Sequence, residues 1–156
     1  MADPLIFGEK EVEFLQELVR QKVEFMIVGF AAAALQGAPV VTQDVDLWFS
    51  KLPHPGIDEA LKSVHGSYVA PTPSSPPMFA GRGIELFDIV VHMHGLGTFA
   101  EEKKHTIKVP LGRTKVHVLK LERIIASKKA TGRPKDKLVM STLADALKTI
   151  KGRGEK

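Results

Sequence analysis

The sequence predicts a single α/β (α+β) domain in which helices flank a mixed β-sheet and a helical pair ends the chain. The first observation is length, because 156 residues suit one domain with a proper hydrophobic core. The second is that short apolar runs suited to strands occur between helical segments up to residue 119. The third is that residues 120–151 show helical periodicity alone. We therefore expect one domain over 1–156, with a sheet core and N-terminal helix over 1–119 and C-terminal helices over 120–151.

The first helix and the first strand are predicted from their apolar spacing. Residues 9–23 carry apolar side chains at the spacing of one helical face, with an acidic start and a basic end that complement the helix dipole. Residues 24–28 follow as a strand whose unbroken apolar run suits a central, doubly covered position. Gly29 then makes a turn into a short Ala-rich helix over 31–35, which Gly37 ends.

A second strand is expected to carry Asp44 and Asp46. Residues two apart in a strand project from the same face, with Cα atoms roughly 6–7 Å apart, so both carboxylates face one side. In one interpretation they hold a divalent cation that carries a phosphate chain, and free N–H groups after Gly29 take phosphate. In the other, Asp44 ends a loop and Asp46 is a solvated strand residue.

Residues 57–64 are predicted to form a helix, and the segment after it is rich in proline. The run APTPSSPP at 70–77 has four prolines in seven residues, which prevents helix and disfavours an interior strand. This segment is either a mobile flap near a site or a plain surface excursion.

The third strand is expected over residues 83–94, with Phe87, Ile89, Val91 and Met93 on one face. Asp88 lies within the apolar run FDIVV on the other face, where burial would be costly without a cation or a hydrogen-bond donor. His92 and His94 share that face, either as metal ligands or as the point where the strand emerges into solvent.

A hairpin and two helices complete the prediction. Residues 106–109 and 115–119 are joined through a glycine turn. The segment 131–134, Thr-Gly-Arg-Pro, ends one helix and begins the next. Lys128 follows Leu121 by seven residues and therefore leaves the inward face of the first of these helices. A lysine placed there needs an anionic partner, either a carboxylate of the protein or a ligand phosphate.

Charge is distributed unevenly along the chain. Residues 1–102 hold 6 of the 22 Lys+Arg and 14 of the 18 Asp+Glu, a net −8, whereas residues 103–156 hold the other 16 and 4, a net +12. This asymmetry suits a metal-bound polyphosphate or a nucleic acid, unless the lysines are solvated helix faces. The absence of cysteine excludes disulfides and thiolate metal sites. We expect a cytoplasmic protein with no membrane partner, because no apolar run reaches spanning length and no signal-peptide pattern is present.

Taken together, these features resemble the nucleotidyltransferase superfamily with the polymerase-beta-like fold. The resemblance rests on the first strand with Gly29-Phe30, the Ala-rich helix, and Asp44-Val-Asp46. Asp88 falls where the family places its third carboxylate, and LERIIASKKATGRPKD over 121–136 is similar to its C-terminal element. The similarity spans nearly the whole chain and is closest to small bacterial nucleotidyltransferase-like proteins, including toxins of abortive-infection toxin–antitoxin pairs.

The resemblance implies Mg²⁺-dependent transfer of a nucleotidyl group from an NTP, such as ATP, to a hydroxyl of RNA, a protein or a small molecule. It implies that Asp44, Asp46 and Asp88 are catalytic and bind two Mg²⁺ ions. It places Gly29 and Phe30 at the turn that binds the triphosphate. It gives Lys128 the role of stabilising phosphate charge, and makes Arg133 a contact to nucleotide or acceptor unless it pairs with Asp136.

Two departures from the family pattern leave alternative functions open. The turn reads Gly29-Phe30 where the family has Gly-Gly or Gly-Ser, and the run VVTQ before Asp44 lacks the arginine common there. One alternative is therefore a catalytically degenerate protein that binds a nucleotide or a partner protein. Another is a basic nucleic-acid-binding module without a catalytic site.

Overall fold

A five-stranded mixed sheet forms the centre of the computed structural model, which describes residues 7–152 without the side chains of residues 135, 137 and 138. The strand order is β5-β2-β1-β7-β6. β1 is antiparallel to β2 and parallel to β7, β2 is parallel to β5, and β6 is antiparallel to β7. The strands are β1 (Phe25–Val28), β2 (Val45–Phe49), β5 (Phe87–Val90), β6 (Thr106–Leu111) and β7 (Thr114–Leu119). The predicted mixed sheet is confirmed.

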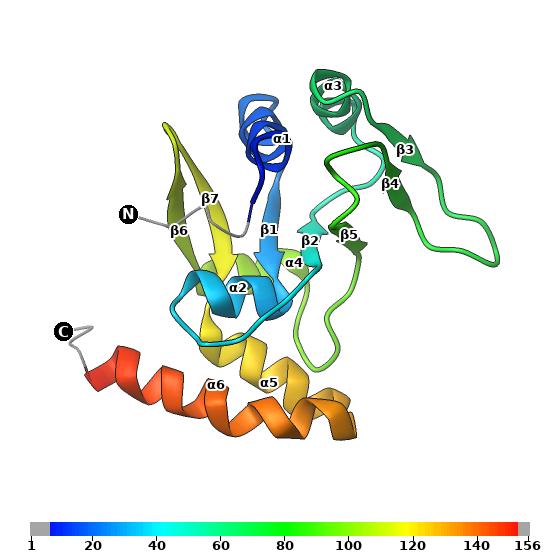
Figure 1. Ribbon diagram of the computed structural model, residues 1–156. Helices are drawn as coiled ribbons and strands as arrows, with labels where there is room; N and C mark the ends of the chain where they lie inside the picture. The colour runs from blue at the N-terminus through cyan, green and yellow to red at the C-terminus, as the bar shows by residue number, and fades with distance from the viewer. Residues whose placement is uncertain (1–6, 153–156) are drawn as a thin grey trace.

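Helices pack around this sheet and continue beyond one end of it (Figure 1). They are α1 (Glu9–Arg20), α2 (Gly29–Leu35), α3 (Pro55–Ser63), α4 (Phe99–Glu102), the 3₁₀ turn η2 (Lys103–His105), α5 (Leu121–Thr131) and α6 (Pro134–Gly152). In Figure 1, α5 and α6 lie together below the sheet, close to α2, while α1 and α3 lie toward its upper end. The predicted C-terminal helical pair is confirmed. Gly132 ends α5 in the left-handed conformation with φ of 65°, which favours glycine.

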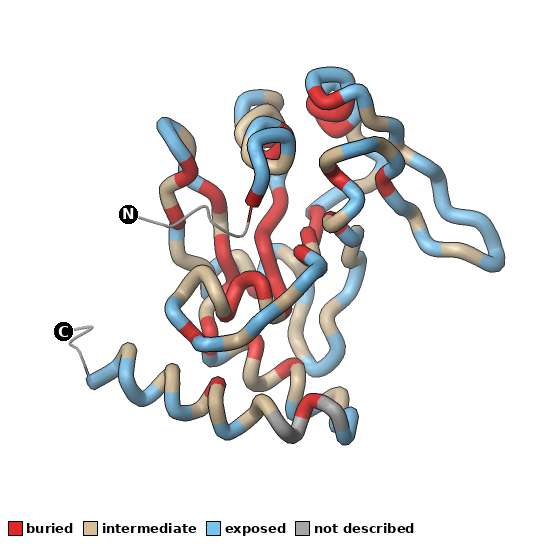
Figure 2. The backbone as a smooth tube through the Cα atoms, viewed as in Figure 1, coloured by how far each residue is buried: buried red, intermediate tan, exposed pale blue. Residues whose placement is uncertain are grey.

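Burial is greatest at β1, whose four residues are all buried (Figure 2). This is the pattern expected of a central strand with neighbours on both sides and helices above and below. Phe14, Leu15 and Leu18 of α1 are fully buried in the same core. Each such side chain contributes about 1.5–3 kcal/mol of hydrophobic stabilisation. β1 is therefore a rigid base for Gly29, which follows it directly.

A second, two-stranded sheet was not predicted. β3 (Ser67–Val69) and β4 (Met78–Ala80) pair antiparallel and project with their connecting loop away from the rest of the molecule (Figure 1). The prolines of residues 70–77 all lie in that loop, where no ladder hydrogen bond is lost. The segment therefore forms the surface excursion, and the flanking strands were too short to recognise from their pattern.

The third predicted strand is shorter than expected, because its partner ends. β5 stops at Val90, which pairs with Trp48 near the end of β2. Val91 lies beyond the strand and is 63% exposed, so the predicted extent of the strand to His94 is wrong. His92 and His94 fall beyond the strand and do not share a strand face. Within residues 7–152, no helix is both long enough and apolar enough to cross a membrane.

Candidate active site

Two of the three predicted carboxylates stand on adjacent strands. Asp46 of β2 and Asp88 of β5 are register partners in a parallel pair, so their side chains project from the same face of the sheet. Asp44 lies just before β2, not within it as expected. The hydroxyl of Thr42 donates to the Asp44 carbonyl at 2.7 Å, and the Asp44 N–H donates to the Thr42 hydroxyl at 3.3 Å. Asp44 thus belongs to a turn that leads into the carboxylate pair.

The three carboxylates act on one another electrostatically. Burial raises the pKa of Asp46 above its usual range, and the negative charges of Asp88 and Asp44 raise this pKa further, while Lys128 opposes them. Burial also raises the pKa of Asp88, with the charge of Asp44 adding to the effect. No ion pair involving these three residues occurs among the described side chains. Negative charge is therefore concentrated here and only partly compensated by Lys128.

Gly29 lies against Asp46. Its φ is +70°, in the left-handed region that favours glycine, and a Cβ added to it would lie 2.7 Å from Asp46 Oδ2. No side chain fits at that distance without displacing the carboxylate. Glycine at this position therefore allows the backbone at the end of β1 to approach Asp46 closely.

Lys128 points toward α2 and contacts Phe30. The Lys128 Nζ lies 4.3 Å from the centroid of the half-buried Phe30 ring, within the range of a cation–π interaction. Leu121 and Ile124, on the stripe predicted to face inward, are buried. Lys128 therefore contacts the Phe30 ring and also interacts electrostatically with Asp46. Asp46 is an anionic partner of the kind predicted for a lysine on the inward face of this helix.

Arg133 and Asp136 lie in the connection between α5 and α6. Arg133 is exposed, whereas Asp136 is 4% exposed and its Oδ2 has no hydrogen-bond partner among the described atoms. The Asp136 N–H donates to the Arg133 carbonyl at 3.0 Å, but no ion pair joins the two side chains. Arg133 therefore lies on the surface and forms no ion pair with Asp46 or Asp88 among the described side chains.

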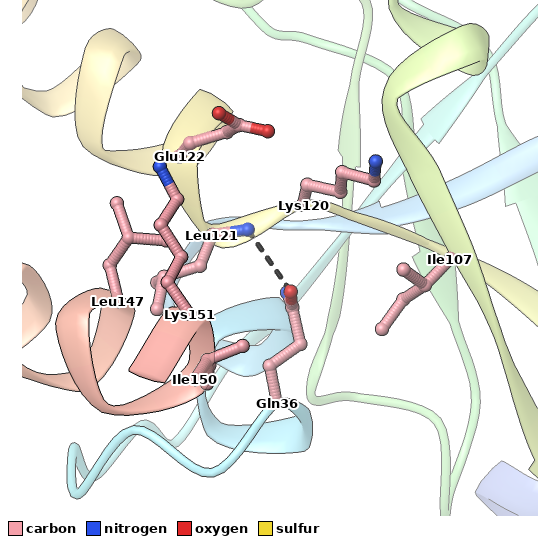
Figure 3. A pocket seen from close by; sticks show the side chains of 8 residues that line it. All are labelled: Gln36, Ile107, Lys120, Leu121, Glu122, Leu147, Ile150 and Lys151. Atoms are coloured by element: carbon pink, nitrogen blue, oxygen red, sulfur yellow. Dashed lines mark hydrogen bonds between the residues drawn. The ribbon is translucent and has the colours of Figure 1, made fainter. Parts of the chain in front are cut away.

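Gln36, which follows α2, connects the glycine segment to α5 and was not singled out from the sequence. Its Nε2 donates to the carbonyls of Leu119 at 2.8 Å and Ala32 at 3.0 Å. Its Oε1 accepts from the Leu121 N–H at 3.0 Å, the dashed line in Figure 3. A cavity of about 200 Å³ beside it also contacts Ile150 and the start of α5 (Figure 3). This cavity lies at the far end of α2 from Gly29 and contains none of the candidate catalytic residues.

A buried ion pair also fixes α5. Glu102 is 3% exposed and accepts from Arg123 through both oxygens, at 2.8 Å from Nε and 2.7 Å from Nη2. The Gly97 N–H donates to the same carboxylate at 2.9 Å. The hydrogen bonds from Arg123, ahead of burial, hold the pKa of Glu102 below its usual range. Together with Gln36, this pair sets the position of the helix that carries Lys128.

The donor set suits a hard divalent cation more than zinc. All candidate ligands are carboxylate oxygens, which Mg²⁺ and Ca²⁺ prefer. In the arrangement of the described side chains, however, no three His, Cys, Asp or Glu residues gather around one point as metal ligands do. The structure presents the pair Asp46 and Asp88, with Asp44 within electrostatic reach.

Comparison with solved structures identifies the fold. A crystal structure of ANT(2″)-Ia in complex with adenylyl-2″-tobramycin matches with a TM-score of 0.56 and 17% identity, over 88% of this chain and 86% of that one. The chain has the nucleotidyltransferase fold. The nucleotidyltransferase fold also occurs in an antigenic nucleotidyltransferase-like protein from Paracoccidioides brasiliensis, with a TM-score of 0.54 and 16% identity over 92% of this chain and 78% of that one.

A solution structure of the antibiotic-resistance factor ANT(2″)-Ia shares the nucleotidyltransferase fold, with a TM-score of 0.53 and 14% identity over 91% of both chains. No family model matches the sequence, and no curated protein matches it. At such identities the likeness establishes the fold, and the chemistry must be argued from this chain's own residues.

Proposed function

We propose that the protein is a Mg²⁺-dependent nucleotidyltransferase that moves a nucleotidyl group from an NTP to a hydroxyl acceptor. The observation that supports this most directly is the pairing of Asp46 with Asp88 across β2 and β5, with Gly29 packed against the first of them. Lys128 adds a cation on the same side of the fold. Such a combination of carboxylates and a lysine suits a metal-bound polyphosphate.

Asp44, Asp46 and Asp88 would hold two Mg²⁺ ions, which when bound would neutralise charge on the triphosphate and on the leaving pyrophosphate. The raised pKa values of Asp46 and Asp88 support this assignment, because part of the rise comes from repulsion between carboxylates. A cation relieves such repulsion, so its binding stabilises the folded site.

The residues of the chain contribute orientation and proton transfer. In the proposed reaction the acceptor oxygen forms a bond to the α-phosphorus, the bond to pyrophosphate breaks, and pyrophosphate leaves with the bonding electrons. Asp88, exposed at the edge strand β5, accepts the proton of the acceptor hydroxyl. Lys128, held over Phe30, stabilises charge on the phosphates. Arg133, on the surface, is available to the nucleotide or the acceptor.

The test is transfer of label from α-labelled NTPs, with Mg²⁺, to RNA, protein and small hydroxyl acceptors. Asp46→Asn should reduce transfer by at least about a hundredfold, because it removes a charge placed for the transition state. Asp58→Asn, at an exposed position in the first turn of α3, is the matched control and should leave transfer unchanged. Absence of transfer to every acceptor class, or equal loss in both variants, would contradict the proposal.

A second candidate is a catalytically inactive protein that binds a nucleotide or a partner protein. Phe30 favours it, because its ring lies next to Gly29 and already engages Lys128. This candidate predicts NTP binding without turnover, no recovery of transfer in Phe30→Ser, and co-purification of a partner. A toxin–antitoxin role belongs to the first candidate and predicts growth arrest on expression that Asp46→Asn abolishes. An NTP substrate favours a cytoplasmic location, where such nucleotides are supplied.

A further inference from the structure

A second charged site lies at the opposite end of β1 from Gly29. β1 and β7 pair through Ile27 and Val118, and Figure 1 shows the two strands diverging toward the start of β1. A groove of about 400 Å³ opens there, lined by the end of α1, the start of β1, η2, β6 and β7. None of the candidate catalytic residues contributes to it.

The groove is strongly basic. Its lining includes Lys22, Lys103, Lys108 and Lys115, against a single carboxylate, Glu24. Glu24 forms an ion pair with Lys103, so three lysines make no ion pair with any described side chain. The surrounding segment is basic as well, since residues 103–120 contain six Lys+Arg and no Asp or Glu. The uncompensated charge therefore attracts an anion with several negative groups.

The cations come from several positions along the strands. Lys115 and His117 lie two residues apart on β7, a separation of roughly 6–7 Å, and Lys108 on β6 is the register partner of His117. Lys22, which follows α1, also lines the groove. Burial lowers the pKa of His117, and the charges of Lys103 and Lys108 lower it further, which is consistent with a positive field in the groove. A single free phosphate needs donors directed at one point, whereas a phosphodiester chain presents charges at intervals.

Apolar side chains complete the groove. The half-buried Val19 lines it, and Val23, Phe25 and Val116, each at most 6% exposed, form its floor. Such a surface suits the ribose or base of a nucleotide, because both present apolar faces between the phosphates. An acidic peptide would place carboxylates there and gain less from this surface. A positively charged groove that follows the phosphate backbone is a feature of sites that bind single strands.

We propose that this groove binds single-stranded nucleic acid, with phosphates at Lys22, Lys108 and Lys115 and a sugar or base against the apolar lining. This goes beyond the proposed nucleotidyl transfer and does not depend on it, because binding requires none of the three aspartates.

The experiment is fluorescence anisotropy of the full chain with short labelled single-stranded RNA and DNA of mixed sequence across a salt series. The variant Lys108→Gln/Lys115→Gln should bind at least about tenfold more weakly at low salt. It should lower the slope of log affinity against log salt by about 1.4, that is, about 0.7 for each phosphate contact on a single strand. Lys51→Gln, at an exposed lysine after β2, is the matched control and should stay within about twofold of the unmodified chain. Asp46→Asn should bind like the unmodified chain, which separates this site from the active site.

Four results would overturn the proposal: no saturable binding of either single strand at low salt, equal weakening in Lys51→Gln, tighter binding of duplex DNA, or tighter binding of polyglutamate. The last would assign the groove to an acidic protein partner. Circular dichroism of the variants checks that weaker binding does not arise from unfolding. Should the double variant fail to fold, Lys108→Gln and Lys115→Gln tested singly must each lower the salt slope by about 0.7.

Discussion

Gly29→Ala is the substitution that most directly tests the close approach of β1 to Asp46. The added Cβ would lie 2.7 Å from Asp46 Oδ2 and 3.5 Å from its Cγ. Alanine would also have to adopt φ of +70°, which costs about 1 kcal/mol. Forcing the half-buried carboxylate aside adds about 1–3 kcal/mol, the usual cost of overpacking. We expect a total loss of about 2–4 kcal/mol in the free energy of unfolding.

The matched control is Gly37→Ala, because Gly37 also has a positive φ, of +96°, but a Cβ there would meet nothing within 4 Å. It should cost only the backbone strain, about 1 kcal/mol, or about 2–4 °C in Tm for a chain of this size. Gly29→Ala should lower Tm by roughly 5–15 °C on the same scale. It should also reduce nucleotidyl transfer by about a hundredfold, because a displacement of about 1 Å in a catalytic group has that effect.

Thermal unfolding and label transfer measure both effects, and a second background separates strain from contact. In Asp46→Ala the nearest remaining atom of residue 46 is Cβ, 3.7 Å from the added methyl group, an ordinary contact. Gly29→Ala should therefore cost about 1 kcal/mol in that background. The reasoning is wrong if Gly29→Ala is no more harmful than Gly37→Ala, or if its cost is the same with and without the Asp46 carboxylate.

Three further predictions concern charge and contact around this site. Asp46→Asn should raise the Tm of the metal-free protein at neutral pH by about 2–4 °C, because it removes about 1 kcal/mol of the cost of burying the charge and of its repulsion by Asp88 and Asp44. Because the pKa of Asp46 is raised, the gain should shrink as pH falls through the folded pKa and be absent below the unfolded value of about 3.9. A gain that persists in acid would contradict this. Phe30→Leu should weaken NTP binding about threefold to fivefold by removing the ring beneath Lys128, whereas Phe30→Tyr should not, as isothermal titration would show. Glu102→Gln should cost about 1–3 kcal/mol at pH 7 in urea unfolding, because it leaves the partly exposed Arg123 without its charged partner. Because the pKa of Glu102 is lowered in the folded state, the ion pair stabilises the protein fully at pH values above the unfolded pKa of about 4.3. The penalty of Glu102→Gln should therefore shrink as pH falls below that value. A penalty that does not change with pH would argue against an ionic origin.

The parts of the fold that the sequence predicted are those set by local pattern. The unbroken apolar run at 25–28 became the buried central strand, and the seven-residue spacing from Leu121 to Lys128 placed the lysine on the side of α5 that faces α2. Periodicity of this kind needs no knowledge of the partner element. Asp88 was singled out because a charge inside an apolar run is costly to bury, but in the structure it lies exposed on the edge strand β5, so the expected burial is wrong and its catalytic role stays a prediction.

The parts that were missed depend on partners distant in the sequence. Gln36 and Glu102 hold α5 through contacts with residues 85 and 21 positions away, and no local spacing distinguishes either from a surface residue. The length of β5 was overestimated because strand length is set by the neighbouring β2, which ends near Trp48. Such features depend on contacts between segments that are distant in the sequence, and these contacts form only when the chain is folded.

Phe30 bears on whether the turn at Gly29 can support catalysis. In the sequence, a bulky residue after Gly29 suggests that phosphate could be obstructed from the turn. In the structure the close approach to Asp46 is made by Gly29 alone, and the Phe30 ring is engaged with Lys128. The Phe30 ring therefore holds the Lys128 ammonium group near the carboxylates. A small residue at this position would leave open space instead. Measuring label transfer beside NTP binding in Phe30→Tyr and Phe30→Leu decides whether this arrangement supports turnover. An active enzyme keeps transfer in Phe30→Tyr and loses part of it with NTP binding in Phe30→Leu, whereas an inactive nucleotide-binding protein loses NTP binding in Phe30→Leu and shows transfer in neither variant.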